Sequence, residues 1–170
     1  TFLASLAYET RQIRLGTGTI NLPNSHPAAV AAQVAMVDHM CDGRFILGIS
    51  PGGLRSDAEV FGTLDQDRKA MAREAIDQVL AIWAGEAPYD LRGDYWQIST
   101  ARTLDAAIGQ GIILKPLQLP HPPIAVPGMS RNSPSMKTAA RRGHQPFSHC
   151  LVPGNVVADT WQTYEQAALE

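Results

Sequence analysis

Apolar and polar positions follow two alternating periods along the first half of the chain. Apolar side chains recur every three to four residues over 27–40 and 66–85, the spacing of an α-helix with one buried face. Continuous apolar or β-branched runs over 13–22 and 44–50 are typical of strands. Residues 13–50 therefore predict a strand, a helix and a strand, which together form a parallel βαβ unit with a right-handed crossover.

Helix and strand signals continue to the end of the chain. Pro27 suits the first turn of its helix, and Gly43 suits the left-handed residue that follows a helix end. The remaining predicted elements are helices at 1–10, 133–143 and the C-terminal end, a hairpin at 89–98, and strands at 124–127 and 145–152. Strands that begin about thirty residues apart and alternate with helices indicate an α/β fold, either a barrel or a doubly wound sheet.

The composition is that of an ordinary globular domain. The 170 residues are 45% hydrophobic and 18% charged, with a net charge of −2. This balance gives no indication of a nucleic-acid or membrane-surface partner, and no apolar run approaches the roughly 20 residues of a membrane span. Cys41 and Cys150 suggest neither a disulfide framework nor a metal site, which favours a cytoplasmic protein. Both ends read as parts of helices, so we expect an internal piece of a longer protein.

One motif, Gly48-Ile49-Ser50-Pro51-Gly52, matches the G-x-S-x-G elbow that carries the nucleophile of serine hydrolases. In that elbow the backbone N–H after the serine helps to bind the oxyanion. Here that residue is Pro51, which has no N–H. A hydrolase with Ser50 as its nucleophile is therefore a disfavoured hypothesis.

Ligands of α/β folds bind where the strands end, and two such places contain suggestive residues. Gly16, Gly18, Gly52 and Gly53 follow neighbouring predicted strands, where they are either ordinary turn glycines or sites at which a flat ring approaches the backbone. The N-terminus of the helix at 133–143 offers free N–H groups to an anion. Residues there that could hold a phosphate are Arg131, Asn132, Ser133 and Ser135, although capping alone also explains Ser133.

Several motifs in order resemble the bacterial luciferase-like flavin monooxygenases over roughly residues 1–150. They are IRLGTGTINLPNSHP at 13–27, CDGRFILGISPGG at 41–53, EVFGTL followed by DR, M and E at 59–74, and GDYWQI at 93–98. The segment KPLQLPHPPIAV at 115–126 is similar to the alkane- and limonene-type subgroup. The resemblance implies a TIM (β/α)8 barrel with insertions, of which residues 1–170 form a partial domain containing about strands 3 to 6. It also marks 86–120 as an insertion that contains the hairpin and a loop.

The resemblance implies a flavin-dependent monooxygenase that uses reduced FMN and O₂ to oxidise a small organic substrate. The alternatives are an F420-dependent oxidoreductase on the same barrel and a non-catalytic flavin-binding subunit. Expected partners are a flavin reductase and a second copy in a homodimer. Because the flanking barrel strands are missing from these 170 residues, we expect them to be inactive alone.

The resemblance also assigns cofactor-binding residues and no metal. The family's flavin-contacting bulge falls on Gly18 and Thr19, where a non-proline cis peptide is common. Asn21 would point toward the flavin ring, and Ser50, Gly52 and Gly53 would line the pocket. Luciferase has a phosphate-binding arginine where Pro51 stands, which shifts the expected phosphate contacts to Arg131, Ser133 and Ser135. Residues 51–63 and 86–120 are candidate lid or substrate loops.

Overall fold

A computed structural model describes residues 2–149 and 151–170; Cys150 and Thr1 lie outside the described residues. The helices are α1 (Phe2–Glu9), α2 (Pro27–Met40), α3 (Arg55–Val60), α4 (Arg68–Ala84), α5 (Pro134–Arg141) and α6 (Gly154–Ala168), with a 3₁₀ turn at Leu22–Asn24. The strands are β1 (Leu15–Gly16), β2 (Ile20–Asn21), β3 (Phe45–Ser50), β4 (Asp90–Arg92), β5 (Gln97–Ser99), β6 (Ile124–Pro127) and β7 (Gln145–Phe147).

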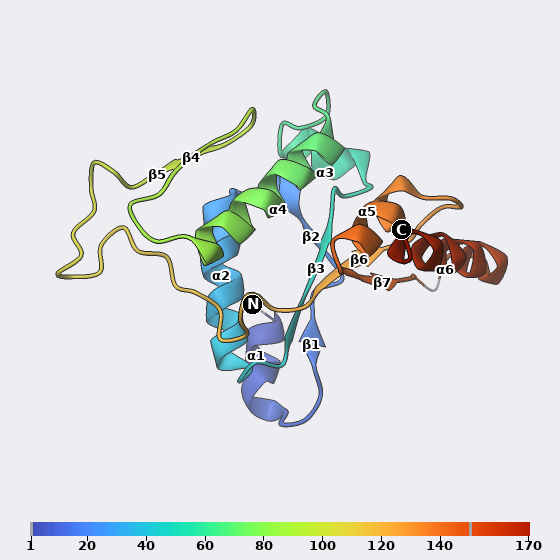
Figure 1. Ribbon diagram of the computed structural model, residues 1–170, viewed down its shortest axis with the longest axis horizontal. Helices are drawn as coiled ribbons and strands as arrows, with labels where there is room; N and C mark the ends of the chain where they lie inside the picture. Colours follow the sequence, from blue (N-terminus) through green and yellow to red (C-terminus); the bar gives the residue numbers. More distant parts are fainter. Residues whose placement is uncertain (1, 150) are drawn as a thin grey trace.

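A parallel sheet forms the centre of the molecule. Its strand order is β1–β3–β6–β7. Strand β2 also pairs with β3, further along that strand than β1, and all of these pairs are parallel. In the view of Figure 1, α2 and α4 pack together to the left of β3, and α5 and α6 pack together to its right, with α5 against β6 and β7. The predicted α/β fold and the βαβ unit formed by β1, β2, α2 and β3 are confirmed.

The core lies where α2 and α4 meet β3. The predicted apolar face of α2 buries Val30 and Val34, and the central strand buries Leu47. From α4, Val79 and Ile82 are fully buried against this layer. None of the helices in the described part of the chain is long and apolar enough to cross a membrane.

The strand predicted over residues 13–22 is interrupted. Gly16 pairs with Ile46, and pairing resumes where Ile20 meets Ile49. Three residues on the first strand therefore oppose two on β3, which is the definition of a β-bulge. The peptide bond between Gly18 and Thr19, inside this bulge, is cis, as the resemblance implied. An apolar pattern of period two does not encode an inserted residue, so the sequence predicted one continuous strand.

A hairpin and a long loop extend away from the sheet. Strands β4 and β5 pair antiparallel, as predicted, and project with the following loop to one side of the molecule (Figure 1). The hairpin is attached to α4 through Glu74, whose carboxylate accepts hydrogen bonds from the backbone N–H groups of Asp94, Tyr95 and Trp96. Helix α3, in the segment expected to be a loop, was not predicted.

Candidate functional site

The bulge brings four of the predicted site residues into one hydrogen-bonded cluster at the carboxyl end of β3. The Oγ1 atom of Thr19 lies 2.7 Å from the Oγ atom of Ser50. Ser50 in turn donates to Oδ1 of Asn21 at 2.7 Å, because the amide oxygen carries no proton. The backbone N–H of Gly52 donates to Oγ of Ser50 at 3.1 Å. We call Thr19, Asn21, Ser50 and Gly52 the bulge cluster.

The numbers of protons and lone pairs on the side chains decide which group donates in each hydrogen bond of the bulge cluster. A serine hydroxyl has one proton to donate and two lone pairs. Ser50 gives its proton to Asn21, so the Thr19 proton points into the cluster, toward Oγ of Ser50 at 2.7 Å and Oδ1 of Asn21 at 3.3 Å. Ser50 therefore uses its donor and both lone pairs inside the cluster. No histidine or carboxylate within the described residues bonds to Ser50, so the geometry also argues against an activated nucleophile.

The same count of protons and lone pairs shows which donors and acceptors of the bulge cluster remain available to a ligand. Thr19 donates its proton inward, which leaves lone pairs on Oγ1 that accept hydrogen bonds. The Asn21 side chain accepts through Oδ1, which leaves its NH₂ group as a donor. Gly18, next to Thr19, is exposed, and nothing lies within 4 Å of the position that a Cβ would take there. The cluster thus offers one acceptor and one donor beside an open stretch of backbone.

Arg68 brings a positive charge to this cluster. Its Nη1 donates to the carbonyl oxygen of Leu54 at 3.3 Å, whereas Nε and Nη2 are buried and have no partner within the described residues. Gly52 has φ +76°, and a Cβ at this position would collide with Nη2 of Arg68. Arg68 is half-buried as a residue, but buried guanidinium nitrogens without a partner are unfavourable, so this position is suited to a negatively charged ligand.

The start of α4 fixes the backbone of Arg68. Asp67 is the N-cap, and its Oδ1 accepts from the N–H groups of Lys69 and Ala70 at 3.0 Å each. The hydrogen bond from Ala70, with smaller help from Lys69 and Arg73, holds the pKa of the Asp67 carboxyl below its ordinary value. Asp67 therefore stays ionised as a cap, and Arg68 occupies the first position of the helix.

The second predicted group lies before α5, at the end of β6. Because β6 is parallel to β3 and beside it, both groups lie at the same edge of the sheet. Ser133 is buried at the N-cap position, but its hydroxyl bonds to that of Ser135 at 2.7 Å instead of capping the helix. Arg131 is exposed, and no hydrogen bond between described residues joins these three to the bulge cluster.

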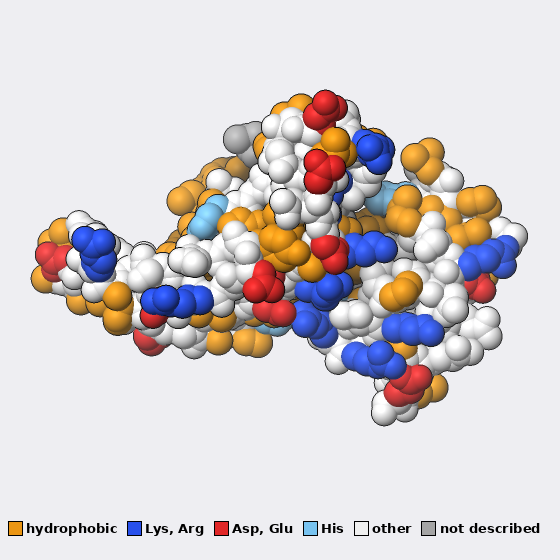
Figure 2. Space-filling view, turned by 90° about the horizontal axis from the view of Figure 1, so that it is seen from above, with side chains coloured by type: hydrophobic (Ala, Val, Ile, Leu, Met, Phe, Trp, Pro, Cys, Tyr) orange, Lys and Arg blue, Asp and Glu red, His pale blue; other side chains and the backbone are white. Residues whose placement is uncertain are grey.

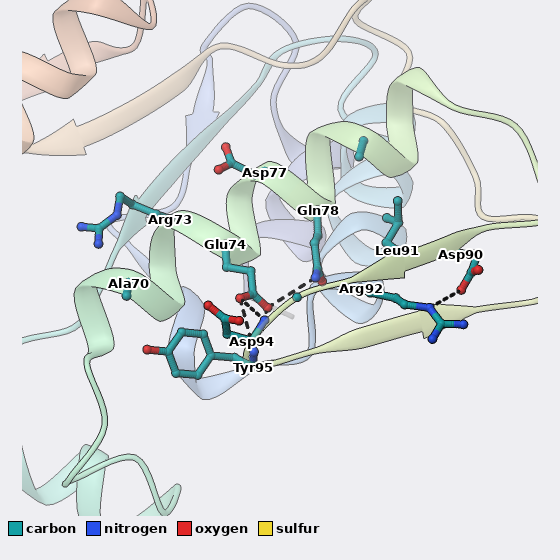
Figure 3. Close-up of a pocket in the computed structure, with 12 residues that line it drawn as sticks. Ala70, Arg73, Glu74, Asp77, Gln78, Asp90, Leu91, Arg92, Asp94 and Tyr95 are labelled. Atoms are coloured by element: carbon teal, nitrogen blue, oxygen red, sulfur yellow. Dashed lines mark hydrogen bonds and ion pairs between the residues drawn. The ribbon is translucent and has the colours of Figure 1, made fainter.

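Two hollows lie near these elements, and only one adjoins the bulge. An open hollow of about 350 Å³ is bounded by Thr17, Gly18, Ile46, Ala125 and Phe147. A larger, open hollow of about 530 Å³ lies between α4 and the β4–β5 hairpin. Figure 3 shows Glu74 pointing from α4 into the hairpin turn, where backbone N–H groups occupy its carboxylate. We therefore place the candidate site at the bulge.

Acidic and basic side chains are mixed over the face that Figure 2 shows. They lie side by side over the middle of this face, with hydrophobic side chains among them. This mixture agrees with the small net charge and gives no broad basic field of the kind that binds nucleic acid.

The sequence identified most of this site and missed one residue. Thr19, Asn21, Ser50 and Gly52 come together, whereas Gly53 is exposed, with nothing within 4 Å of the position of its Cβ. Arg68 was part of a quoted motif but received no role, because an arginine in the first turn of a helix usually lies at the surface. The signal that could have found it is Pro51, since the loss of an arginine there directs attention to the arginines that follow, Arg55 and Arg68.

Comparison with known proteins points to the same family as the sequence motifs do. The model of the family "Luciferase-like monooxygenase" matches residues 1–170. A 4-hydroxyprotoasukamycin monooxygenase of Streptomyces nodosus subsp. asukaensis is 33% identical over 99% of this chain and 44% of its own length. The oxygenase component of a flavin-dependent trigonelline monooxygenase of Acinetobacter baylyi is 35% identical over 77% of this chain and 34% of its own.

A solved structure shows the same fold with a cofactor. The oxygenating constituent of 3,6-diketocamphane monooxygenase of Pseudomonas putida, in complex with FMN, superposes with a TM-score of 0.85 at 26% identity. The match covers 98% of this chain and 46% of that one, so the chain spans about half the length of the relatives it matches. The parallel strands and the helices of this chain are therefore part of a TIM barrel. The chain belongs to the family of luciferase-like monooxygenases.

Proposed function

We propose that the full-length protein is a monooxygenase that uses reduced FMN and O₂ to oxidise a small organic substrate. The observation that carries this proposal is the guanidinium of Arg68, which lies beside Gly52 with Nε and Nη2 buried and unpartnered. FMN ends in a phosphate, and a guanidinium binds phosphate oxygens with two parallel hydrogen bonds. The described residues therefore fit the charged end of FMN.

The polar groups of the bulge cluster fit the other end of the same cofactor. The flavin ring system carries carbonyl oxygens and N–H groups along one edge. Asn21 has a free NH₂ donor and Thr19 has free lone pairs, so the two residues match an edge of that kind. Gly18, Gly52 and Gly53 would let the ring approach the backbone closely.

We place Ser133, Ser135 and Arg131 in a supporting role toward the phosphate. The two serine hydroxyls share one hydrogen bond, so one of their two protons is left to donate. Arg131 adds an exposed positive charge at the same edge of the sheet. Arg68 differs from all three because two of its charged nitrogens, Nε and Nη2, are buried without a partner, so we expect it to contribute more to binding.

Bound reduced FMN supplies the reducing power that activates O₂, and the protein supplies position and seclusion. Thr19 and Asn21 orient the ring through hydrogen bonds, while Arg68 neutralises the phosphate. The segment after Gly53 contains the exposed apolar side chains Leu54, Val60 and Phe61, which suit it to cover an apolar substrate. Ser50 holds Thr19 and Asn21 in place and does not attack the substrate.

We further propose that a separate flavin reductase supplies reduced FMN, and that the protein is a cytoplasmic homodimer. The name of the Acinetobacter relative as an oxygenase component supports the first of these partners. The homodimer and the cytoplasmic location remain predictions from the resemblance.

Titration of the full-length protein with FMN and, separately, with F420 tests the proposal. We expect saturable quenching of FMN fluorescence, weaker binding of F420, and weaker binding of FMN by the Ser133→Ala/Ser135→Ala double variant. Oxygen uptake should then require reduced FMN and an organic substrate. Preference for F420 would favour the oxidoreductase alternative, and tight FMN binding without oxygen uptake would favour the non-catalytic subunit.

A further inference from the structure

Thr17, the first residue of the bulge, makes an unusual pair of hydrogen bonds with β3. Its Oγ1 atom accepts from the backbone N–H of Gly48 at 2.9 Å and donates to the carbonyl oxygen of the same residue at 2.8 Å. Both backbone groups of Gly48 on this side of β3 are thus satisfied by one side-chain hydroxyl. In an uninterrupted parallel ladder, backbone atoms of the neighbouring strand would serve them.

Gly48 is closely fitted to the same residue. A Cβ at position 48 would collide with the carbonyl oxygen of Thr17, and Gly48 is buried. Along its opposite edge β3 pairs regularly with β6, and there the N–H of Leu47 donates to the carbonyl oxygen of Pro123 at 2.9 Å. The start of the bulge is therefore fastened to the backbone of β3 where the Thr17 hydroxyl lies against Gly48, which has no side chain.

This contact lies directly before the bulge cluster. The backbone N–H of Thr17 bonds to the carbonyl oxygen of Ile46 at 3.2 Å, which ends the β1 pairing. Pairing resumes only at Ile20, and between these points Thr17 is the bulge residue that bonds to the backbone of β3, whereas Thr19 bonds to the side chain of Ser50. The register that brings Asn21 opposite Ser50 depends on the one inserted residue being retained.

We infer that Thr17 is a positioning residue for cofactor binding, which rests on the proposed function. Its hydroxyl is consumed by Gly48 and acts through the backbone: it holds the bulge so that Thr19 and Asn21 present their acceptor and donor to the ligand. Only serine or threonine supplies a donor and an acceptor on one atom at this distance from Cα. Valine has the shape of threonine and leaves both groups of Gly48 unpaired.

Amide hydrogen exchange in the full-length protein tests the contact without any ligand. In the wild type and in Thr17→Ser, the Gly48 N–H should be protected. In Thr17→Val the Gly48 N–H should exchange at least about tenfold faster relative to the N–H of Leu47, which bonds to Pro123 on the β6 side of β3. Val79→Ala, a core truncation on α4, should shift both amides together. An unchanged ratio in Thr17→Val would overturn the inference.

FMN binding by the same variants tests the positioning role. Thr17→Ser should retain the visible circular dichroism of FMN bound to the wild type, and it should retain the wild-type affinity for FMN. Thr17→Val should alter that spectrum and weaken binding about tenfold. Val79→Ala should lose stability but keep the spectrum. Faster exchange at Gly48 with unchanged FMN spectrum and affinity would show that Thr17 does not position the site. Absence of FMN binding in the wild type would instead refute the proposed function, while the exchange ratio still reports on the contact.

Discussion

Single residues decide what the site can do, and Ser50 is the clearest example. The G-x-S-x-G pattern predicts an exposed nucleophile, yet the hydroxyl is fully occupied by Thr19, Asn21 and Gly52. A pattern of five letters records neither the partners of the serine nor the N–H that Pro51 lacks. Ser50 therefore acts as the central link of a hydrogen-bonded cluster.

Replacing Ser50 with alanine should weaken cofactor binding. The change leaves the Gly52 N–H, the Asn21 oxygen and the Thr19 hydroxyl without their common partner. We expect FMN affinity to fall about five- to tenfold, equivalent to about one lost hydrogen bond. Fluorescence titration measures this, with Ser56→Ala on the exposed start of α3 as the matched control. Full FMN affinity together with complete loss of activity would instead restore the nucleophile hypothesis.

Elements were predicted well where local rules determine them. Helix α2 has the predicted bounds because Pro27 fixes its start and Gly43, at φ +70°, follows its end. The apolar pattern could not predict the interrupted strand, since the bulge depends on the contact of Thr17 with Gly48, thirty-one residues away, and only the family resemblance indicated a bulge at Gly18 and Thr19. Helix α3 was missed because it buries only Ala58 and so has almost no apolar face.

The attachment of the hairpin to α4 should depend on Glu74. Three backbone N–H groups bond to its carboxylate, and a Cβ at Gly93 would collide with it. Glu74→Ala should lower the free energy of unfolding by about 2–3 kcal/mol, because bonds to a charged acceptor are stronger than neutral ones. Denaturant unfolding measures the change.

Glu86 provides the matched control for Glu74. Its carboxylate is exposed and pairs with Lys115 at 2.8 Å, so Glu86→Ala should cost less than about 1 kcal/mol. Equal losses in the two variants would contradict the role assigned to Glu74.

At the scale of the whole molecule, His144 makes stability depend on pH. Burial, together with Arg142 and His121, lowers its pKa from 6.5 to about 4, although Asp77 opposes this shift. The unfolded chain therefore binds a proton between pH 6.5 and 4 that the folded protein does not. Stability should fall as pH drops through this window, by up to about 3 kcal/mol.

Replacement of His144 isolates this effect. His144→Gln should flatten the acid side of the stability curve, measured by chemical unfolding between pH 4 and 7. His39→Gln, at an exposed position on α2, should retain the wild-type slope. The account of His144 fails if the two variants have the same pH dependence.

The open sheet predicts that residues 1–170 alone do not turn over substrate. Within the described residues, β1, β2 and β7 each pair on one side only, so the sheet is not closed into a barrel. Such edges leave the cavity beside Gly18 open to water. Oxygen uptake should therefore be absent for this piece and present for the full-length protein. Turnover by a sample of verified mass would contradict the prediction.

The most direct measurement compares FMN with riboflavin, which lacks only the phosphate. If Arg68 binds the phosphate, the wild-type full-length protein should prefer FMN, and Arg68→Gln should reduce that preference by about 10–100-fold. Arg73→Gln, an exposed arginine on the same helix, should keep the wild-type ratio. Equal affinity of the wild type for FMN and riboflavin, or an unchanged ratio in Arg68→Gln, would contradict the account of this site.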